Sequence, residues 1–205
     1  MVAMAQMLHH IATNQNNNIM NRLFIIVAVV ATIVGCSQER RWGIEERRAL
    51  REDIRTLRDM AYLDNLTEVE FDTFAGDVIE AIEIDYPVYT TFVELPSRGD
   101  TVEVYVVTTI VEALNANPHN LRNLYPYAML VGDGILPAGL SHQALRAYYD
   151  CLSYKVRHYY PTTFAFYSAV ADSPTTPDAI TAMLTSCAAE LFDYANEEIV
   201  ISNEE

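Results

Sequence analysis

Residues 67–85 read TEVEFDTFAGDVIEAIEID, and this stretch decides the fold class. Thr67 and Glu70 have the spacing of a capping box, in which the hydroxyl accepts the third helical amide and the glutamate returns to the cap amide. The apolar residues behind the box recur at helical spacing and share one face: Phe71, Phe74, Val78, Ile79 and Ile82. Pro87 cannot continue a helix. The stretch therefore predicts an amphipathic helix that ends just before Pro87.

The chain downstream repeats this pattern of caps followed by apolar stripes. The expected helix starts are Asp100 in a second box with Glu103, Asn117 before Pro118, Ser141, Thr162 or Thr163, and Thr176 before Pro177 and Asp178. Residues 102–114 are rich in Val and Thr, but a strand would have two apolar faces there, so the helical spacing favours a buried helix. Residues 88–95 fit either a short helix or a strand. Residues 126–140 form the longest irregular stretch, because they contain three glycines and two prolines.

Upstream, residues 44–63 predict a helix with one apolar and one basic face. The two faces consist of Leu50, Ile54, Leu57 and Ala61, and of Arg47, Arg51, Arg55 and Arg58. The arginine stripe has three interpretations: a solvated face, docking onto the protein's own acidic body, or attraction to anionic lipid head groups. Acidic residues interleave with the arginines, which favours the solvated face.

Residues 20–36 read MNRLFIIVAVVATIVGC and differ from the rest of the chain. Arg22 is followed by a run of 12 apolar residues (23–34), then by Gly35 and Cys36. A helix that spans the hydrocarbon core needs about 20 apolar residues, so the run is short for that role, whereas its length and flanks are typical of a secretory signal. A single-pass membrane helix is the competing interpretation.

The last four residues of this stretch, Ile33 to Cys36, fit the lipobox, and the stretch resembles the signal peptide of a bacterial lipoprotein. The resemblance implies cleavage before Cys36, acylation of Cys36, and a body held on a membrane of the cell envelope, with the outer membrane favoured over the inner one. The expected organisation is a polar leader or mis-assigned start (residues 1–19), a signal peptide (20–35), a lipid anchor and tether (36–43), an all-α domain (44–196) and an acidic tail (197–205).

The charge of the chain excludes one class of partner. Arg22 is the only charged residue before Cys36, so residues 36–205 contain 12 basic and 28 acidic residues. Nucleic-acid binding needs a basic surface that neutralises phosphates, so we expect no nucleic-acid partner. The charge is also segregated, because seven of the 12 basic residues fall within residues 36–58 and the remainder of the chain is strongly acidic.

Cys151 and Cys187 are the only cysteines after Cys36. In an oxidising envelope they could form a disulfide, and the alternative is two buried thiols; the sequence leaves both open. The histidines beyond the leader, His119, His142 and His158, have no metal-ligand partner three or four positions away, so we expect no metal or other cofactor.

A cluster of aromatic residues between positions 125 and 167 is the most suggestive binding feature. Tyrosine combines a ring with a hydroxyl and suits recognition surfaces, but most of these side chains are expected to pack in the core. If one region binds a ligand, we expect it within residues 126–160, with Tyr127, Tyr148, Tyr149 and Tyr160 as the contact residues.

Three functions compete. The favoured one is a lipid-anchored, non-catalytic structural or interaction component with an envelope protein as its partner, and the alternative is a ligand-binding lipoprotein that uses the tyrosine-rich region. An enzyme is the remote third, because no spacing links its only plausible catalytic residues, which are Glu112, Asp133, His142, Asp150 and His158. The sequence therefore predicts an all-α domain of about six or seven helices behind a cleaved lipoprotein signal.

Overall fold

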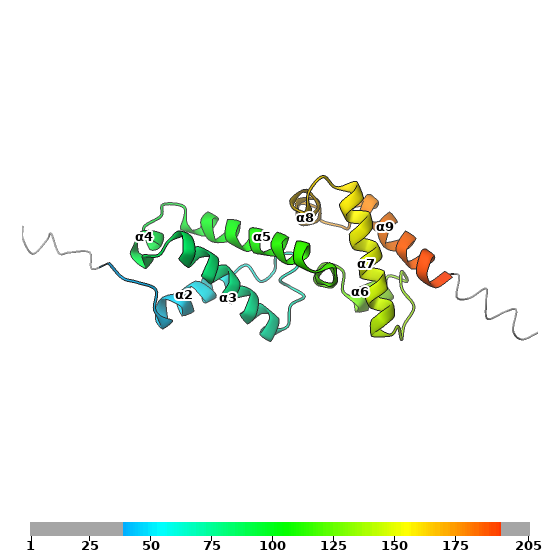
Figure 1. Ribbon diagram of the computed structural model, residues 1–205, viewed down its shortest axis with the longest axis horizontal. Coiled ribbons are helices and arrows are strands. Elements are labelled where there is room, and N and C mark those ends of the chain that lie inside the picture. The colour runs from blue at the N-terminus through cyan, green and yellow to red at the C-terminus, as the bar shows by residue number, and fades with distance from the viewer. Residues whose placement is uncertain (1–38, 194–205) are drawn as a thin grey trace, which may run out of the picture. The chain divides into compact units, whose positions relative to one another are not determined.

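The computed structural model describes residues 39–193 and confirms the all-α fold for this part of the chain (Figure 1). The elements are α2 (Ile44–Arg55), α3 (Glu68–Asp85), α4 (Tyr89–Val93), α5 (Arg98–Ala116), the 3₁₀ helix η1 (Pro118–Asn123), α6 (Tyr127–Gly132), α7 (His142–Tyr159), α8 (Thr163–Ala171), α9 (Asp178–Ala188) and the π-helical turn η2 (Ala189–Asp193). The described part has more helices than expected, because α4 and α6 are short helices in segments for which no helix was clearly predicted. The predicted signal peptide, Cys36 and the acidic tail lie outside the described residues. No helix among residues 39–193 has the length and apolar character needed to cross a bilayer.

Helix α3 forms as its sequence predicts. The Thr67 side chain accepts a hydrogen bond from the Glu70 amide, and the Glu70 carboxylate accepts one from the Thr67 amide at 2.9 Å. The five apolar residues of the predicted face are all buried. The helix ends at Asp85, two residues before Pro87. Local signals alone therefore place this helix correctly at both ends.

Helix α2 is shorter than predicted, because it ends at Arg55 and not near residue 63. A series of short-range turns follows, in which Leu57 and Met60 donate to carbonyls three residues earlier. Tyr62 has a φ of 86°, in the left-handed region. This turn brings Leu63 and Leu66 into the core, which a continued helix would not do. Leu57 and Ala61, which were predicted to lie on the apolar face of the helix, lie in this turn region instead.

The arginine stripe is partly exposed and also pairs with acidic side chains of α3, so it combines a solvated face with docking onto the protein's own acidic residues. Arg47 forms a bidentate ion pair with Glu83, in which Nε and Nη2 each donate to one carboxylate oxygen. The Nη2 atom of Arg47 lies 2.8 Å from Oε2 of Glu83. Arg55 pairs with Glu68 at 3.0 Å, and Arg58 lies over the ring of Phe71 at 4.5 Å. The charge segregation seen in the sequence therefore serves helix packing within the domain.

Two predicted caps are displaced, one by three residues toward the N-terminus and one by a single residue toward the C-terminus. Helix α5 begins at Arg98 and not after Asp100, and the guanidinium of Arg98 in the added turn pairs with Asp53 of α2 at 3.0 Å. Helix α9 begins at Asp178 with Pro177 at the cap position, and no side chain caps it. The caps at Asn117, Ser141 and Thr162 are formed as predicted.

Candidate functional site

Most of the aromatic cluster belongs to the core. Tyr125, Tyr148, Tyr149 and Tyr167 are each at most 3% exposed. Their hydroxyl groups are mostly used inside the protein: Tyr148 donates to the Leu184 carbonyl, Tyr149 to the Tyr125 carbonyl and Tyr167 to the Ala61 carbonyl. Burial raises the pKa of Tyr149 and Tyr167 to about 12. These tyrosines are neutral structural residues.

The four tyrosines predicted to contact a ligand do not form one site. Tyr148 is fully buried against α9 and lines none of the hollows described below. Tyr160 lines a separate hollow of about 350 Å³ beside the start of α8. Tyr127 and Tyr149 line the same cavity, so the structure brings two of the four together. The Tyr127 hydroxyl also donates to the Pro137 carbonyl and accepts from the Leu140 amide, which fixes its position.

This shared cavity, which we call the polar pocket, has a volume of about 580 Å³. It lies where η1, the start of α7 and the start of α3 meet. It is lined by Asn65, Thr67, Glu70, Asn117, His119, Arg122, Asn123, Pro126, Tyr127, His142, Leu145, Arg146 and Tyr149. Its size falls in the range of pockets that hold small molecules.

Regular structure positions two walls of the polar pocket. His142, Leu145, Arg146 and Tyr149 lie one helical turn apart on α7, so they form a single stripe that faces the cavity. Ser141 caps this helix by accepting the Ala144 amide at 3.2 Å. The cap at Asn117 fixes the opposite wall, because its side chain accepts the His119 amide at 3.0 Å at the start of η1. Capping residues that the sequence reveals therefore position both walls.

The third wall is tied to η1 by contacts that no local sequence pattern reveals. Arg122 Nη2 lies 2.7 Å from a carboxylate oxygen of Glu70, across 52 residues of chain. The side-chain amide of Asn65 donates to the Asn123 carbonyl at 3.0 Å. The Thr67 amide and hydroxyl, together with Arg122, hold the pKa of Glu70 below its ordinary value, so this carboxylate is ionised at neutral pH.

The polar pocket concentrates arginine and histidine residues in an acidic protein. Residues 59–205 contain five basic residues, and two of them, Arg122 and Arg146, line this one cavity. Two of the three histidines after the leader, His119 and His142, line it as well. Glu70 is its only acidic lining residue. The arrangement suits the binding of an anion.

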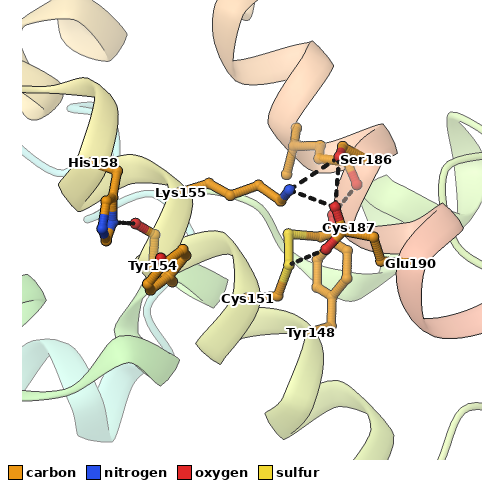
Figure 2. The surroundings of a disulfide bond; sticks show 9 residues. Tyr148, Cys151, Tyr154, Lys155, His158, Ser186, Cys187 and Glu190 are labelled. Atoms are coloured by element: carbon orange, nitrogen blue, oxygen red, sulfur yellow. Dashed lines mark hydrogen bonds and ion pairs between the residues drawn. A yellow bond between two sulfur atoms is a disulfide. The ribbon is translucent and has the colours of Figure 1, made fainter.

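A second hollow of about 620 Å³, the α7–α9 groove, is aromatic. It is lined by Tyr154, Lys155, His158, Tyr159, Ala179, Ala182, Met183 and Ser186. Tyr154 and Tyr159 are 63% and 62% exposed. The groove lies beside a disulfide between Cys151 of α7 and Cys187 of α9, whose Cα atoms are 5.9 Å apart (Figure 2). Of the two alternatives that the sequence left open, the structure therefore has the bonded one.

A serine and a lysine meet at the edge of this groove, and no sequence pattern predicts this contact. Lys155 Nζ lies 3.1 Å from Ser186 Oγ and 2.6 Å from Glu190, and the serine hydroxyl donates to the same carboxylate at 3.0 Å (Figure 2). A serine nucleophile needs a base, and a lysine serves as one only when it is neutral. Lys155 and Ser186 both bond to Glu190, and these bonds lower the pKa of this carboxylate. The cluster is arranged as a polar clip between helices.

The residues considered for catalysis are dispersed. His142 lines the polar pocket and His158 the α7–α9 groove, whereas Glu112, Asp133 and Asp150 line neither. Within the described part of the chain, no three His, Cys, Asp or Glu side chains are placed to hold a metal ion.

Comparisons with known proteins give no relative: no family model, curated protein or solved structure matches the chain.

Proposed function

We propose that this chain is a lipid-anchored, non-catalytic binding protein of the bacterial cell envelope, and that its polar pocket captures a small molecule. The observation that carries the proposal is the polar pocket itself. It has the volume of a small-molecule site, apolar surface from Tyr127, Leu145 and Tyr149, and hydrogen-bonding groups on three walls. A few polar groups that converge on a partly apolar cavity are typical of ligand sites.

The anchor is supported by the sequence of residues 20–36, which ends in Gly35 and Cys36. The Cys151–Cys187 disulfide also supports an envelope location, because disulfides persist in oxidising compartments and are rare in the cytosol. Labelling with radioactive palmitate tests the anchor. The wild-type chain incorporates label and Cys36→Ala does not; equal labelling of both would contradict the acylation of Cys36.

The absence of catalysis is supported by the state of the groups that could perform it. Lys155 and Ser186 are both bonded to Glu190, and this arrangement ties the two side chains together as a link between helices. The remaining titratable candidates lie apart, and catalysis needs a nucleophile or base within hydrogen-bond reach of its partner.

Ligand capture is tested by filling the polar pocket. Leu145→Trp places a large side chain on the pocket stripe of α7, and Ala147→Trp places the same side chain at an exposed position outside the pocket as the control. A panel of sugars, amino acids, carboxylates and phosphate esters is screened by thermal shift. A hit that stabilises the wild type and Ala147→Trp but not Leu145→Trp supports capture in the pocket. If Leu145→Trp responds to every hit as the wild type does, the pocket is not the binding site.

The second candidate is a non-catalytic interaction component that binds an envelope protein, and the α7–α9 groove favours it. Exposed tyrosines beside an apolar residue such as Met183 are enriched at protein interfaces. Crosslinking from position 154 in intact cells tests it, with position 104, an exposed residue of α5, as the control. Adducts of one defined mass from position 154 alone support an interface there.

A further inference from the structure

The structure assigns a ligand class to the polar pocket: we infer that it binds a small molecule carrying a phosphate group, held between Arg122 and Arg146. This inference rests on the proposed function, because it names the chemistry of the ligand that the pocket captures. The inference depends on the hydrogen-bond donors that each wall of the pocket presents.

Arg122 keeps most of its donor groups available. A guanidinium has five N–H donors, and Arg122 uses Nη2 for the Glu70 carboxylate. Glu70 holds the side chain at the pocket wall and offsets its charge, while the other N–H donors of the guanidinium stay available. A planar guanidinium matches phosphate oxygens in a two-bonded geometry, so a guanidinium fixed in this way is a pre-oriented phosphate donor.

Arg146 lines the same pocket from α7 and, among residues 39–193, has no ion pair or side-chain hydrogen bond. It stands one turn after His142, on the stripe of α7 that lines the pocket. The start of α7, an 18-residue helix, adds a partial positive charge at this wall. The Ser141 side chain accepts only the Ala144 amide, so it leaves the amides of the first two helical residues without a side-chain partner. The charge of Arg146 is therefore not offset by an ion pair within the described part of the domain.

The remaining lining residues fit the rest of such a ligand. Asn65, Asn117 and Thr67 offer neutral polar groups beside the cations, so that donors stand on three sides of the cavity. A phosphate group has three acceptor oxygens and a charge between −1.5 and −2 at neutral pH, which matches donors on several sides better than a single carboxylate does. Pro126, Tyr127, Leu145 and the Tyr149 ring supply apolar surface for the organic part.

The same lining argues against a cationic ligand. Glu70 is the only carboxylate among the lining residues, and its oxygens already accept from Thr67 and Arg122. A divalent cation would need several free oxygen ligands. It would also be repelled by two guanidinium groups.

The test measures binding of inorganic phosphate and glycerol 3-phosphate by isothermal titration calorimetry, with glycerol as the neutral probe. The variant is Arg146→Gln, and the control is Arg157→Gln, an exposed arginine of α7 that lines the separate hollow beside α8. The wild type is expected to bind glycerol 3-phosphate more tightly than inorganic phosphate, and glycerol not measurably. Arg146→Gln is expected to weaken phosphate binding at least tenfold, and Arg157→Gln by less than twofold. Arg122→Lys keeps the charge but loses the planar fork, and is expected to weaken binding by an intermediate factor.

The outcomes separate this inference from the proposed function. If the phosphate probes bind equally to the wild type and to Arg146→Gln, the phosphate assignment is overturned. It is also overturned if only neutral molecules bind. In both cases, capture by the pocket stands when Leu145→Trp abolishes the binding. If no member of the wider panel binds and Leu145→Trp changes nothing, both are overturned. Circular dichroism of each variant checks that a loss of binding does not come from a loss of fold.

Discussion

Helices α2 and α3 and helices α7 and α9 are two packed pairs in one all-α chain, yet different forces join them. Both pairs bury apolar side chains, such as Leu50 and Ile54 of α2 and Ile180 and Leu184 of α9. Along the α2–α3 seam the polar links are exposed ion pairs, of which Arg47 to Glu83 is the best formed. Between α7 and α9 the main links are a disulfide and a buried tyrosine hydrogen bond, beside the polar clip of Lys155, Ser186 and Glu190 (Figure 2).

The difference predicts how each pair responds to its surroundings. Exposed ion pairs are screened by salt and contribute little to stability, so the α2–α3 seam should depend mainly on its apolar contacts. A disulfide acts largely by restricting the unfolded chain, so it stabilises whatever the salt concentration but depends on redox conditions. One wall of the polar pocket belongs to α7, so the covalent link supports the helix that carries Arg146.

The largest expected effect is the loss of the disulfide. The chain-entropy relation gives about 4 kcal/mol for a link across 36 residues. Replacing Cys151 and Cys187 by alanine should therefore lower the free energy of unfolding by about that amount, measured by urea denaturation. Dithiothreitol should destabilise the wild type to a similar extent and leave the double variant unchanged. If the wild type and the double variant have the same urea midpoint, the α7–α9 pair does not depend on its covalent link.

The second effect is alkaline unfolding, caused by the buried tyrosines around α7. Burial raises the pKa of Tyr149 to about 12, above the ordinary value near 10. A pKa that is raised on folding contributes stability that is complete below pH 10 and is lost as the pH rises through 12. For this one residue the loss reaches about 3 kcal/mol.

Tyr149→Phe tests this effect. At pH 7 it should cost about 1 kcal/mol, because the hydrogen bond to the Tyr125 carbonyl is lost. Between pH 10 and 12 it should lose less stability than the wild type does. Tyr154→Phe, at an exposed position of the same helix, is the control. Parallel stability curves for the wild type and Tyr149→Phe over this range would show that Tyr149 ionises without unfolding the protein.

The sequence predicted those parts of the fold that local signals determine. The capping box of α3, the cap at Asn117 and the helix from Ser141 to the residue before Tyr160 all follow from side chains within a few positions of the cap. The end of α2 was not predictable in this way. It depends on burying Leu63 and Leu66 against distant helices, at the cost of a left-handed backbone at Tyr62.

The candidate site was predicted only in part, for a similar reason. The tyrosine cluster pointed to the correct region and to Tyr127 and Tyr149, but not to the cationic residues. Arg122 and Arg146 look like ordinary surface residues in the sequence, since their convergence depends on the packing of η1 against α7. The available signal in the sequence is the small number of basic residues after position 58, which makes each of them a candidate for a specific role.

A third, smaller effect tests whether the α2–α3 pair relies on the local order of α3. Thr67→Ala removes the cap and should cost about 1 kcal/mol in urea denaturation. Thr73→Ala is the control, because Thr73 lies in the same helix and its hydroxyl donates to the Val69 carbonyl without capping anything. Folding lowers the pKa of Glu70, so the ionised carboxylate stabilises the folded state at neutral pH. This stabilisation is lost as the pH falls below the ordinary glutamate pKa near 4.5. Equal stability of Thr67→Ala and Thr73→Ala at pH 7 would contradict the capping role.

The smallest expected effect concerns the ion pairs themselves. Arg47→Gln removes the pair with Glu83, and Arg48→Gln removes an exposed arginine at the next position of α2 that has no ion pair within the described residues. In low salt Arg47→Gln should be slightly less stable than Arg48→Gln, and the difference should vanish in 1 M NaCl, because exposed charges are screened over about 3 Å there. The measurement is a urea midpoint for both variants at each salt concentration. If the difference in urea midpoint persists in 1 M NaCl, the ion pair stabilises the α2–α3 seam independently of salt, as the disulfide does for α7 and α9. The contrast between the two pairs then does not hold.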